Sequence, residues 1–262
     1  SNPRQALGVP EIAVLERADG SYIFVLEEKE GKQTAMLTFV RTDLLSRWQQ
    51  TLPPDAPNRF IINVQPEQVE SVTAHLLALG VSKPILYPMI RGRLVELNGK
   101  PVTGDAFGAE DGRARRLAER EFNLSFAAQL RADNTVTEGI FWPAAGPARP
   151  EISVEVEFAK TLGWKLGDEV AFDIAGQRYA ATITSLRKVD WESFKPNFFV
   201  LGSPRSLDGF PASYIAGVHA PESQKERFTN RLVASFPNLS VVDIDAVLDQ
   251  VRSTVDQVSA VV

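Results

Sequence analysis

Residues 186–200 read LRKVDWESFKPNFFV, which places four large aromatic side chains within nine residues. Each of these rings can bury about 150–250 Å² of surface, so most of the stretch must lie inside the protein despite the charged residues between them. The stretch contains no pattern typical of a nucleophile, a metal site or a phosphate cradle. We therefore predict that it anchors a folded module, with Trp191 and Phe198 as the structural anchors.

The sequence around this stretch predicts a β-rich module over residues 117–205. Residues 169–174 alternate apolar and polar side chains, residues 175–177 suit a turn, and residues 178–186 return the chain as the second strand of a hairpin. Short strands separated by turns rich in glycine and proline are typical of a small antiparallel sandwich or barrel.

Two strand–helix–strand halves flank this module. In the first half, residues 59–64 form an apolar run suited to a buried strand, an apolar helical stripe follows, and residues 85–97 form the next strand. The second half repeats this order, with strands at 212–218 and 239–244 around a helix over 222–236. Two such halves predict a ferredoxin-like split sheet with two helices on one face.

The two ends of the chain predict further elements. Residues 10–39 predict a hairpin, with strands at 12–15 and 22–26 about a turn at Asp19 and Gly20. Residues 40–48 form a short amphipathic stretch, and a longer apolar seam near the C-terminus is typical of a helix. The seam consists of Val247, Val251, Val255, Val258 and Val262.

Composition and charge exclude several classes of protein. The apolar fraction of 44% is ordinary for a globular chain, and the net charge of -5 argues against a nucleic-acid-binding protein. The absence of cysteine excludes thiol catalysis, disulfides and cysteine-ligated metals. No apolar run approaches the ~20 residues of a membrane helix, and no signal peptide is visible. The one dense basic run favours a solvated loop and helix face over an anion or lipid-headgroup site, and it consists of Arg113, Arg115, Arg116 and Arg120.

The remaining candidates do not assemble into a catalytic or cofactor site. The two histidines, His75 and His219, have no metal-ligating partner at a suitable spacing. The paired carboxylates at 155/157, 190/192 and 243/245 are also what a solvated strand edge produces. The sequence lacks a nucleophile elbow and a phosphate-binding loop. We therefore expect no catalytic residue, no metal and no cofactor.

Several segments of the chain resemble one known family. Besides residues 186–200, the matching segments are VRTDLLSRW at 40–48, DAPNRFIINVQP at 55–66, PMIRGRL at 88–94, REFNLS at 120–125 and LGWKLGD at 162–168. They occur in the order found in the extracytoplasmic domains of FtsX-like and MacB-like ABC transporter permeases. The resemblance extends over about residues 40–262 and points to the large permeases associated with lysophospholipase biosynthesis or export.

The resemblance implies an α+β fold in which a split ferredoxin-like (βαβ…βαβ) porter lobe carries an inserted antiparallel β-rich, sabre-like lobe. Stalk helices at both ends would continue into membrane helices of a longer protein. The expected segments are an N-terminal extension at 1–39, a stalk helix at 40–56, the porter lobe at 57–102 and 206–244, the sabre-like lobe at 103–205 and a second stalk helix at 245–262.

The resemblance also implies a function. The chain would be a periplasmic domain of a bacterial inner-membrane permease. It would couple cytoplasmic ATP hydrolysis to movement or release of a lipid, lipoprotein or other hydrophobic cargo, without catalysis of its own. The implied partners are an ABC ATPase subunit, a periplasmic esterase of the lysophospholipase type and a second permease copy. Exposed apolar patches mark binding sites, so Phe141 and Trp142 are candidate contacts for a partner or the cargo.

Two other classes of protein stay open at this point. Residues 10–39 resemble the membrane-proximal strands of periplasmic efflux adaptors, which favours an adaptor or interaction protein. The long helical hairpin of an adaptor, however, is not found in the sequence. A hydrolase would need a nucleophile paired with a base, which the sequence does not show. Esterase and phosphatase assays of the purified chain would separate the hydrolase from the other two classes.

Overall fold

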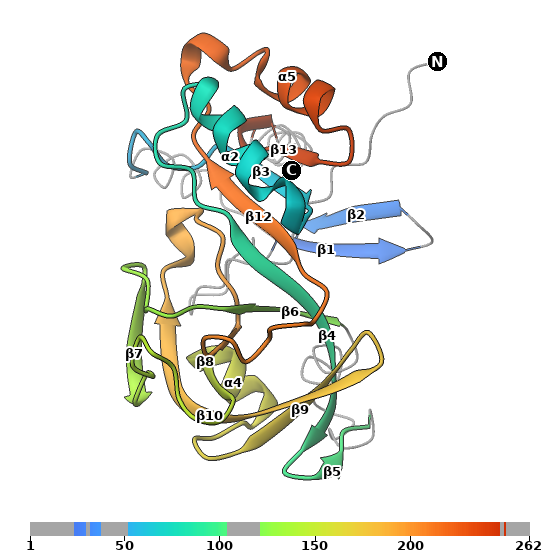
Figure 1. The fold of residues 1–262 in the computed structure, drawn as a ribbon, viewed down its shortest axis with the longest axis vertical. Helices are drawn as coiled ribbons and strands as arrows, with labels where there is room; N and C mark the ends of the chain where they lie inside the picture. Colours follow the sequence, from blue (N-terminus) through green and yellow to red (C-terminus); the bar gives the residue numbers. More distant parts are fainter. Residues whose placement is uncertain (1–23, 30–31, 38–51, 104–120, 247–248, 250–262) are drawn as a thin grey trace, which may run out of the picture. The chain divides into compact units, whose positions relative to one another are not determined.

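The computed structural model describes residues 24–29, 32–37, 52–103, 121–246 and 249, whose elements are labelled in Figure 1. The chain divides into two compact units. The first unit comprises Ser1–Tyr87, Trp191–Pro196 and Tyr214–Val262, and the second comprises Pro88–Asp190 and Asn197–Ser213. The chain therefore crosses between the units four times, and the short segment Trp191–Pro196 belongs to the first unit although both its flanks belong to the second.

Three antiparallel strands lie side by side in the first unit (Figure 1). β3 lies between β12 and β13, with Val64 opposite Tyr214 and Ile62 opposite Ser240. The elements of this unit are β3 (Arg59–Val64), η2 (Pro66–Gln68), α2 (Val69–Ala78), β12 (Ser213–Val218), η5 (Glu222–Gln224), α5 (Phe228–Ser235) and β13 (Ser240–Asp243).

The helices of the first unit form because their apolar residues recur at spacings of three and four. Val72 and Leu76 of α2 and Phe228 and Leu232 of α5 are fully buried in one cluster with residues of β3 and β12. Gly80 follows the end of α2 with a φ of 87°, a conformation that glycine adopts without steric cost. The predicted helix over 222–236 is shorter than expected, because η5 occupies its first turn and α5 begins only at residue 228.

A separate hairpin precedes these elements and differs from the predicted one. β1 (Phe24–Lys29) pairs antiparallel with β2 (Lys32–Leu37), so that Phe24 lies opposite Leu37. The prediction placed the partner strand at 12–15, which lies outside the described residues. The prediction did not use the apolar residues 35–37, and these supply the partner of β1.

Six strands of the second unit close into a barrel. The pairing runs from β4 to β6, β11, β8, β10 and β9, and β9 pairs again with β4. β7 extends the sheet beyond β10, and β5 pairs with the end of β4. The elements are β4 (Tyr87–Leu97), β5 (Lys100–Pro101), β6 (Glu121–Phe126), β7 (Asn134–Gly139), β8 (Glu151–Glu155), α4 (Val156–Leu162), β9 (Glu169–Ile174), β10 (Gln177–Val189) and β11 (Val200–Gly202).

The prediction of a purely antiparallel lobe is wrong, because two of the strand pairs in the barrel are parallel. β8 is parallel to β10, and β11 is parallel to β6. A parallel pair needs a long crossover, and α4 with β9 supplies the one between β8 and β10. The β9–β10 hairpin, in contrast, is confirmed: Gln177 lies opposite Ile174 across a turn at Ala175 and Gly176.

Side chains fill the inside of the barrel. Leu124, Phe172 and Ile174 are fully buried in the largest apolar cluster of the described residues, which also contains Phe158 and Trp164. A Cβ added at Gly92 would lie only 3.1–3.3 Å from the side chains of Leu124, Ile174 and Phe172. This core is the main apolar support of the second unit.

The structure is thus a mixed α/β protein that consists mostly of sheet, with few helices and one closed sheet. The predicted stalk helices lie almost wholly outside the described residues, since these omit 38–51, 247–248 and 250–262, and the basic run at 113–120 lies outside them as well. None of the described helices is both long enough and apolar enough to span a membrane.

Candidate functional site at the Arg59 junction

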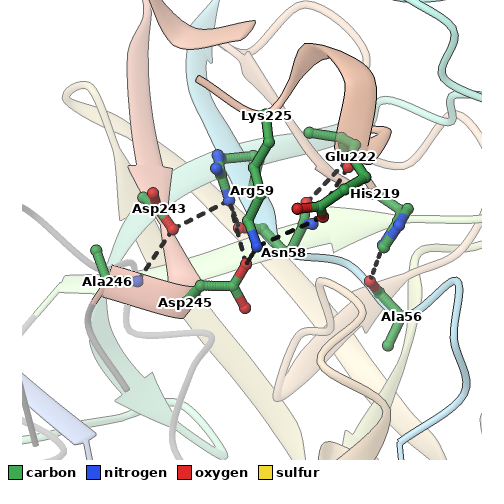
Figure 2. Close-up of polar contacts among 10 residues, drawn as sticks. Ala56, Asn58, Arg59, His219, Glu222, Lys225, Asp243, Asp245 and Ala246 are labelled. Carbon is green, nitrogen blue, oxygen red and sulfur yellow. Dashed lines mark hydrogen bonds and ion pairs between the residues drawn. The ribbon is translucent and has the colours of Figure 1, made fainter. Parts of the chain in front are cut away.

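Arg59 lies where the segment leading into β3 meets the segment leaving β13. The two strands pair so that Arg59 is opposite Asp243, and the Ile244 N–H donates to the Asn58 carbonyl at 3.0 Å. The incoming and outgoing segments of the first unit therefore run side by side. Figure 2 shows this region, and we use the name Arg59 junction for Asn58, Arg59, His219, Glu222, Lys225, Asp243 and Asp245.

The Arg59 guanidinium is the buried charge at the centre of the junction. The residue is 2% exposed, and its Nη1 donates to the Asn58 carbonyl at 2.8 Å. The same nitrogen lies 3.0 Å from Asp243 Oδ1 and 3.7 Å from Asp245 Oδ2. A buried charge is costly unless it is paired, so the incoming segment holds two carboxylates of the outgoing segment.

The carboxylates of the junction have further partners (Figure 2). Asp243 Oδ1 accepts the Ala246 N–H at 3.0 Å, as a capping residue does at the start of a helical turn. Lys225 Nζ lies 3.4 Å from Asp245 Oδ2 and 3.7 Å from Glu222 Oε2. The negative charge of Asp245, followed by that of Glu222, raises the pKa of Lys225. Because Lys225 and its partners are substantially exposed, water and salt screen this outer part of the junction.

Asn58 and His219 fix the incoming segment to the end of β12. The Asn58 N–H donates to the Val218 carbonyl at 2.9 Å, and its side-chain oxygen accepts the Ala220 N–H at 2.7 Å. His219 Nδ1 lies 2.9 Å from the Ala56 carbonyl. This hydrogen bond gives His219 a structural role in the fixation of residues 56–58.

An apolar cluster supports the polar side chains of the junction. Phe60, Phe194, Val242 and Ile244 are buried together, and Leu52 of the incoming segment packs against them. A single cluster therefore contains residues of the incoming segment, the outgoing segment and the aromatic stretch at 186–200.

The structure places the four residues singled out from the sequence in different surroundings. Trp142 is buried, and its indole N–H donates to the Ala127 carbonyl at 2.9 Å. Phe141 is half-buried, with its ring centroid 4.1 Å from that of Trp142, and the neighbouring Ile140 is 80% exposed. Phe198 is buried in the second unit, whereas Trp191 is half-buried in the first. Their predicted roles as contacts and anchors stay predictions.

The sequence reasoning missed Arg59 as the partner of Asp243 and Asp245. It considered the two carboxylates as a pair and interpreted them as a solvated strand edge. A signal was available, because an arginine at the first position of a largely apolar strand needs a counter-charge once it is buried. The strand that supplies this charge, however, is about 180 residues away in the sequence, and only the register of β3 and β13 brings it alongside.

A second buried polar cluster surrounds Arg187 of β10 in the second unit. Its Nη1 donates to Asn134 Oδ1 at 2.9 Å, and its Nη2 donates to the Phe198 carbonyl. The Asn134 amide donates to Asn197 Oδ1 and to Asp133 Oδ1, each at 3.0 Å. Burial lowers the pKa of Arg187 to about 10, and this group is therefore still charged at neutral pH.

Among residues 52–103 and 121–246, no group of three or more His, Cys, Asp or Glu side chains is placed to hold a metal ion. The two histidines have different partners. The His75 ring packs edge-on against the Phe236 ring, with 5.6 Å between the ring centroids, whereas His219 Nδ1 is hydrogen-bonded to the Ala56 carbonyl.

No protein-family model matches the chain. The chain is 39% identical over 217 residues to the uncharacterized ABC transporter permease YbbP of Escherichia coli strain K12. The match covers 83% of this chain but only 25% of YbbP, so the chain spans about a quarter of the length of that relative. The chain is therefore similar to one portion of an ABC transporter permease.

Proposed function

We propose that the chain is the periplasmic domain of an FtsX-like or MacB-like ABC transporter permease of the bacterial inner membrane. The similarity to YbbP and the segments that resemble such permeases support this proposal. The β3, β12 and β13 order, with a helix in each half, supports a split ferredoxin-like porter lobe. The barrel would be the inserted sabre-like lobe.

In this proposal the domain is not an enzyme but transmits movement from the membrane. ATP hydrolysis by a partner ATPase subunit would displace membrane helices, and the stalk segments would pass that displacement to the folded lobes. The supporting observation is the Arg59 junction, where a buried cation and an apolar cluster hold the incoming and outgoing segments together. Two segments held in this way move as one body, which is what a hinge or shear transition requires.

The cargo in this proposal is a lipid, a lipoprotein or another hydrophobic molecule. The half-buried Phe141 and the exposed Ile140 beside it would contribute to its contacts or to those of a partner, and the buried Trp142 would support them by packing against Phe141. A periplasmic esterase of the lysophospholipase type and a second permease copy are the further proposed partners.

The location can be tested because the chain contains no cysteine. A thiol introduced by Ile140→Cys, in a cysteine-free version of the full-length permease, would be the only reactive group in the domain. A membrane-impermeant maleimide should label it in intact spheroplasts as fully as after lysis. Labelling only after lysis would overturn the periplasmic location.

The transmission of movement can be tested without knowledge of the cargo. Spin labels at Leu77 and Ile140, both exposed, would report on the first and the second unit respectively. The permease, reconstituted with its ATPase in lipid vesicles, should show a different distribution of label distances with ATP plus vanadate than without nucleotide. Identical distributions in both states would contradict the proposed function.

A further inference from the structure

Asn98 and Gly99 form the turn that joins β4 to β5. Leu97 pairs with Lys100, so the two residues make a two-residue hairpin loop, with φ values of 52° and 74°. They are the only Asn–Gly pair in the sequence. The turn lies wholly within the second unit, at the end of the β4–β9 pairing that closes the barrel.

The Asn98 side chain extends this closing pairing beyond β4. The Asn98 N–H donates to the Glu169 carbonyl at 2.8 Å, and Asn98 Oδ1 accepts the Glu169 N–H at 2.9 Å. A side-chain oxygen therefore acts here as a backbone carbonyl would in the ladder. Asn98 Nδ2 donates to Asp168 Oδ1 at 2.9 Å, and Asp168 Oδ2 accepts the Lys165 N–H at 2.8 Å. The amide thus uses both of its polar atoms to hold the β4–β5 turn to the chain that enters β9.

An asparagine followed by glycine can also react with its own backbone. The Gly99 nitrogen attacks Asn98 Cγ, a C–N bond forms and the Cγ–Nδ2 bond breaks, so the Gly99 hydrogen and the NH₂ group leave as ammonia. Water then opens the cyclic imide at either carbonyl, which yields aspartate or isoaspartate at position 98. Gly99 has no side chain to hinder the attack, and a Cβ placed there would meet no atom of the described residues within 4 Å.

We propose that Asn98 is a modification site, whose deamidation the closed barrel restrains and whose product loosens the β4–β9 pairing. The reaction is restrained because Cγ is held across the pairing until the hydrogen bonds to Asp168 and Glu169 break. The pairing loosens because the product has a carboxylate where Nδ2 donated to Asp168, and two carboxylates at this distance repel each other. This site goes beyond the proposed function and does not depend on it.

The rate of the reaction tests the restraint. The purified chain is aged at mildly alkaline pH, and mass spectrometry of its peptides measures the fraction of Asn98 that is converted. We expect conversion to be about tenfold slower in the folded chain than in the same chain unfolded in urea. Equal rates in the two states would overturn the restraint.

Two variants locate the restraint within the barrel. Asp168→Ala should speed the conversion of Asn98 several-fold in the folded chain, because it frees Nδ2. Asp173→Ala is the matched control, since Asp173 also accepts a backbone N–H, that of Gly176 at 2.8 Å, but in the β9–β10 turn. The control should leave the rate unchanged, and equal acceleration by both variants would overturn the role of Asp168. If Asp168→Ala does not fold, the comparison of the folded and unfolded wild type still decides.

The stability of Asn98→Asp, which is the direct product, tests the loosening. This variant should unfold at a lower urea concentration than the wild type at neutral pH. The difference should shrink as the pH falls toward about 4, because a proton shared by the two carboxyl groups then relieves the repulsion. Asn98→Gly is the control, since it suits the positive φ and removes the amide without adding a charge. Its difference from the wild type should not depend on pH, and a pH-independent difference for Asn98→Asp would overturn the loosening.

Discussion

At the scale of single residues, burial is divided unequally between the partners of the Arg59 junction. Arg59 is 2% exposed, whereas the side chains of Asp243 and Asp245 are 38% and 42% exposed. Water can solvate the carboxylates if the cation is removed, but it cannot solvate the cation if its carboxylate is removed. Loss of Arg59 and loss of Asp243 should therefore lower the free energy of unfolding by different amounts.

We expect Asp243→Ala to lower the free energy of unfolding by about 3 kcal/mol, because it leaves a buried cation short of a partner and removes a cap. Arg59→Met should cost only about 1–2 kcal/mol, since its long apolar side chain keeps much of the packing. Urea denaturation measures both values. Glu121→Ala, which breaks an exposed pair with Arg91, is the control and should change the result by no more than about 0.5 kcal/mol. Equal costs for Asp243→Ala and Arg59→Met would contradict this account.

Glu155 makes the stability of the second unit depend on pH. Burial raises the pKa of Glu155 above its ordinary value of 4.5, although the Phe158 N–H and the charge of Arg187 oppose the shift. The folded state therefore binds this proton more tightly than the unfolded state. Its contribution to stability is present in acid and is lost as the pH rises from 4.5 through the raised value.

The variant Glu155→Gln isolates this effect, because its side chain can still accept the Phe158 N–H but does not titrate. We expect the variant to gain stability relative to the wild type as the pH rises from about 4 to about 7. Denaturation curves recorded at several pH values in this range would show the trend. A constant difference between the two proteins would mean that Glu155 titrates alike in the folded and unfolded states.

At the scale of elements, the β9–β10 turn has alanine at a position where asparagine is usually preferred. Ala175 and Gly176 have φ values of 51° and 82°, which are those of a type I′ turn. Asparagine adopts the first of these conformations more readily than alanine does. We expect Ala175→Asn to raise the free energy of unfolding by about 0.5–1 kcal/mol in thermal or urea denaturation. Ala175→Val should lower it, because a β-branched residue resists this conformation, and a gain from valine would refute the turn assignment.

The elements that depend on local signals could be predicted from the sequence. The β9–β10 hairpin follows from alternation and a turn, and α2 follows from its apolar stripe and Gly80. The parallel pairing of β8 with β10 could not be predicted in the same way, because it depends on how a crossover packs. The pairing of Arg59 with Asp243 is also non-local, so the sequence analysis considered Asp243 and Asp245 without connecting them to Arg59.

At the scale of the whole molecule, the proposed transmission depends on stiff connections at the Arg59 junction. We expect three glycines inserted after Asp245 in the full-length permease to abolish the nucleotide-dependent change between labels at Leu77 and Ile140. Each glycine disfavours helix by about 0.8–1.0 kcal/mol and adds slack to the outgoing segment. ATP hydrolysis by the partner subunit should continue.

The matched control inserts the same glycines after Gly176, in the exposed β9–β10 turn of the second unit. This variant should keep the nucleotide-dependent change, because the turn connects only two neighbouring strands. If the insertion after Asp245 also leaves the label distances responsive to nucleotide, the outgoing segment does not carry the movement.

The barrel of the second unit also limits the route of anything that such a transporter moves. Its six strands enclose Leu124, Phe172 and Ile174, and at Gly92 there is no room even for one more methyl group without contact closer than 3.4 Å. These side chains fill the barrel at the level of Gly92, so we expect that a hydrophobic molecule does not pass along the barrel axis at this level. The cargo of the proposed transporter would then move along the outer surface of the domain, and the barrel would act as a rigid body and not as a channel.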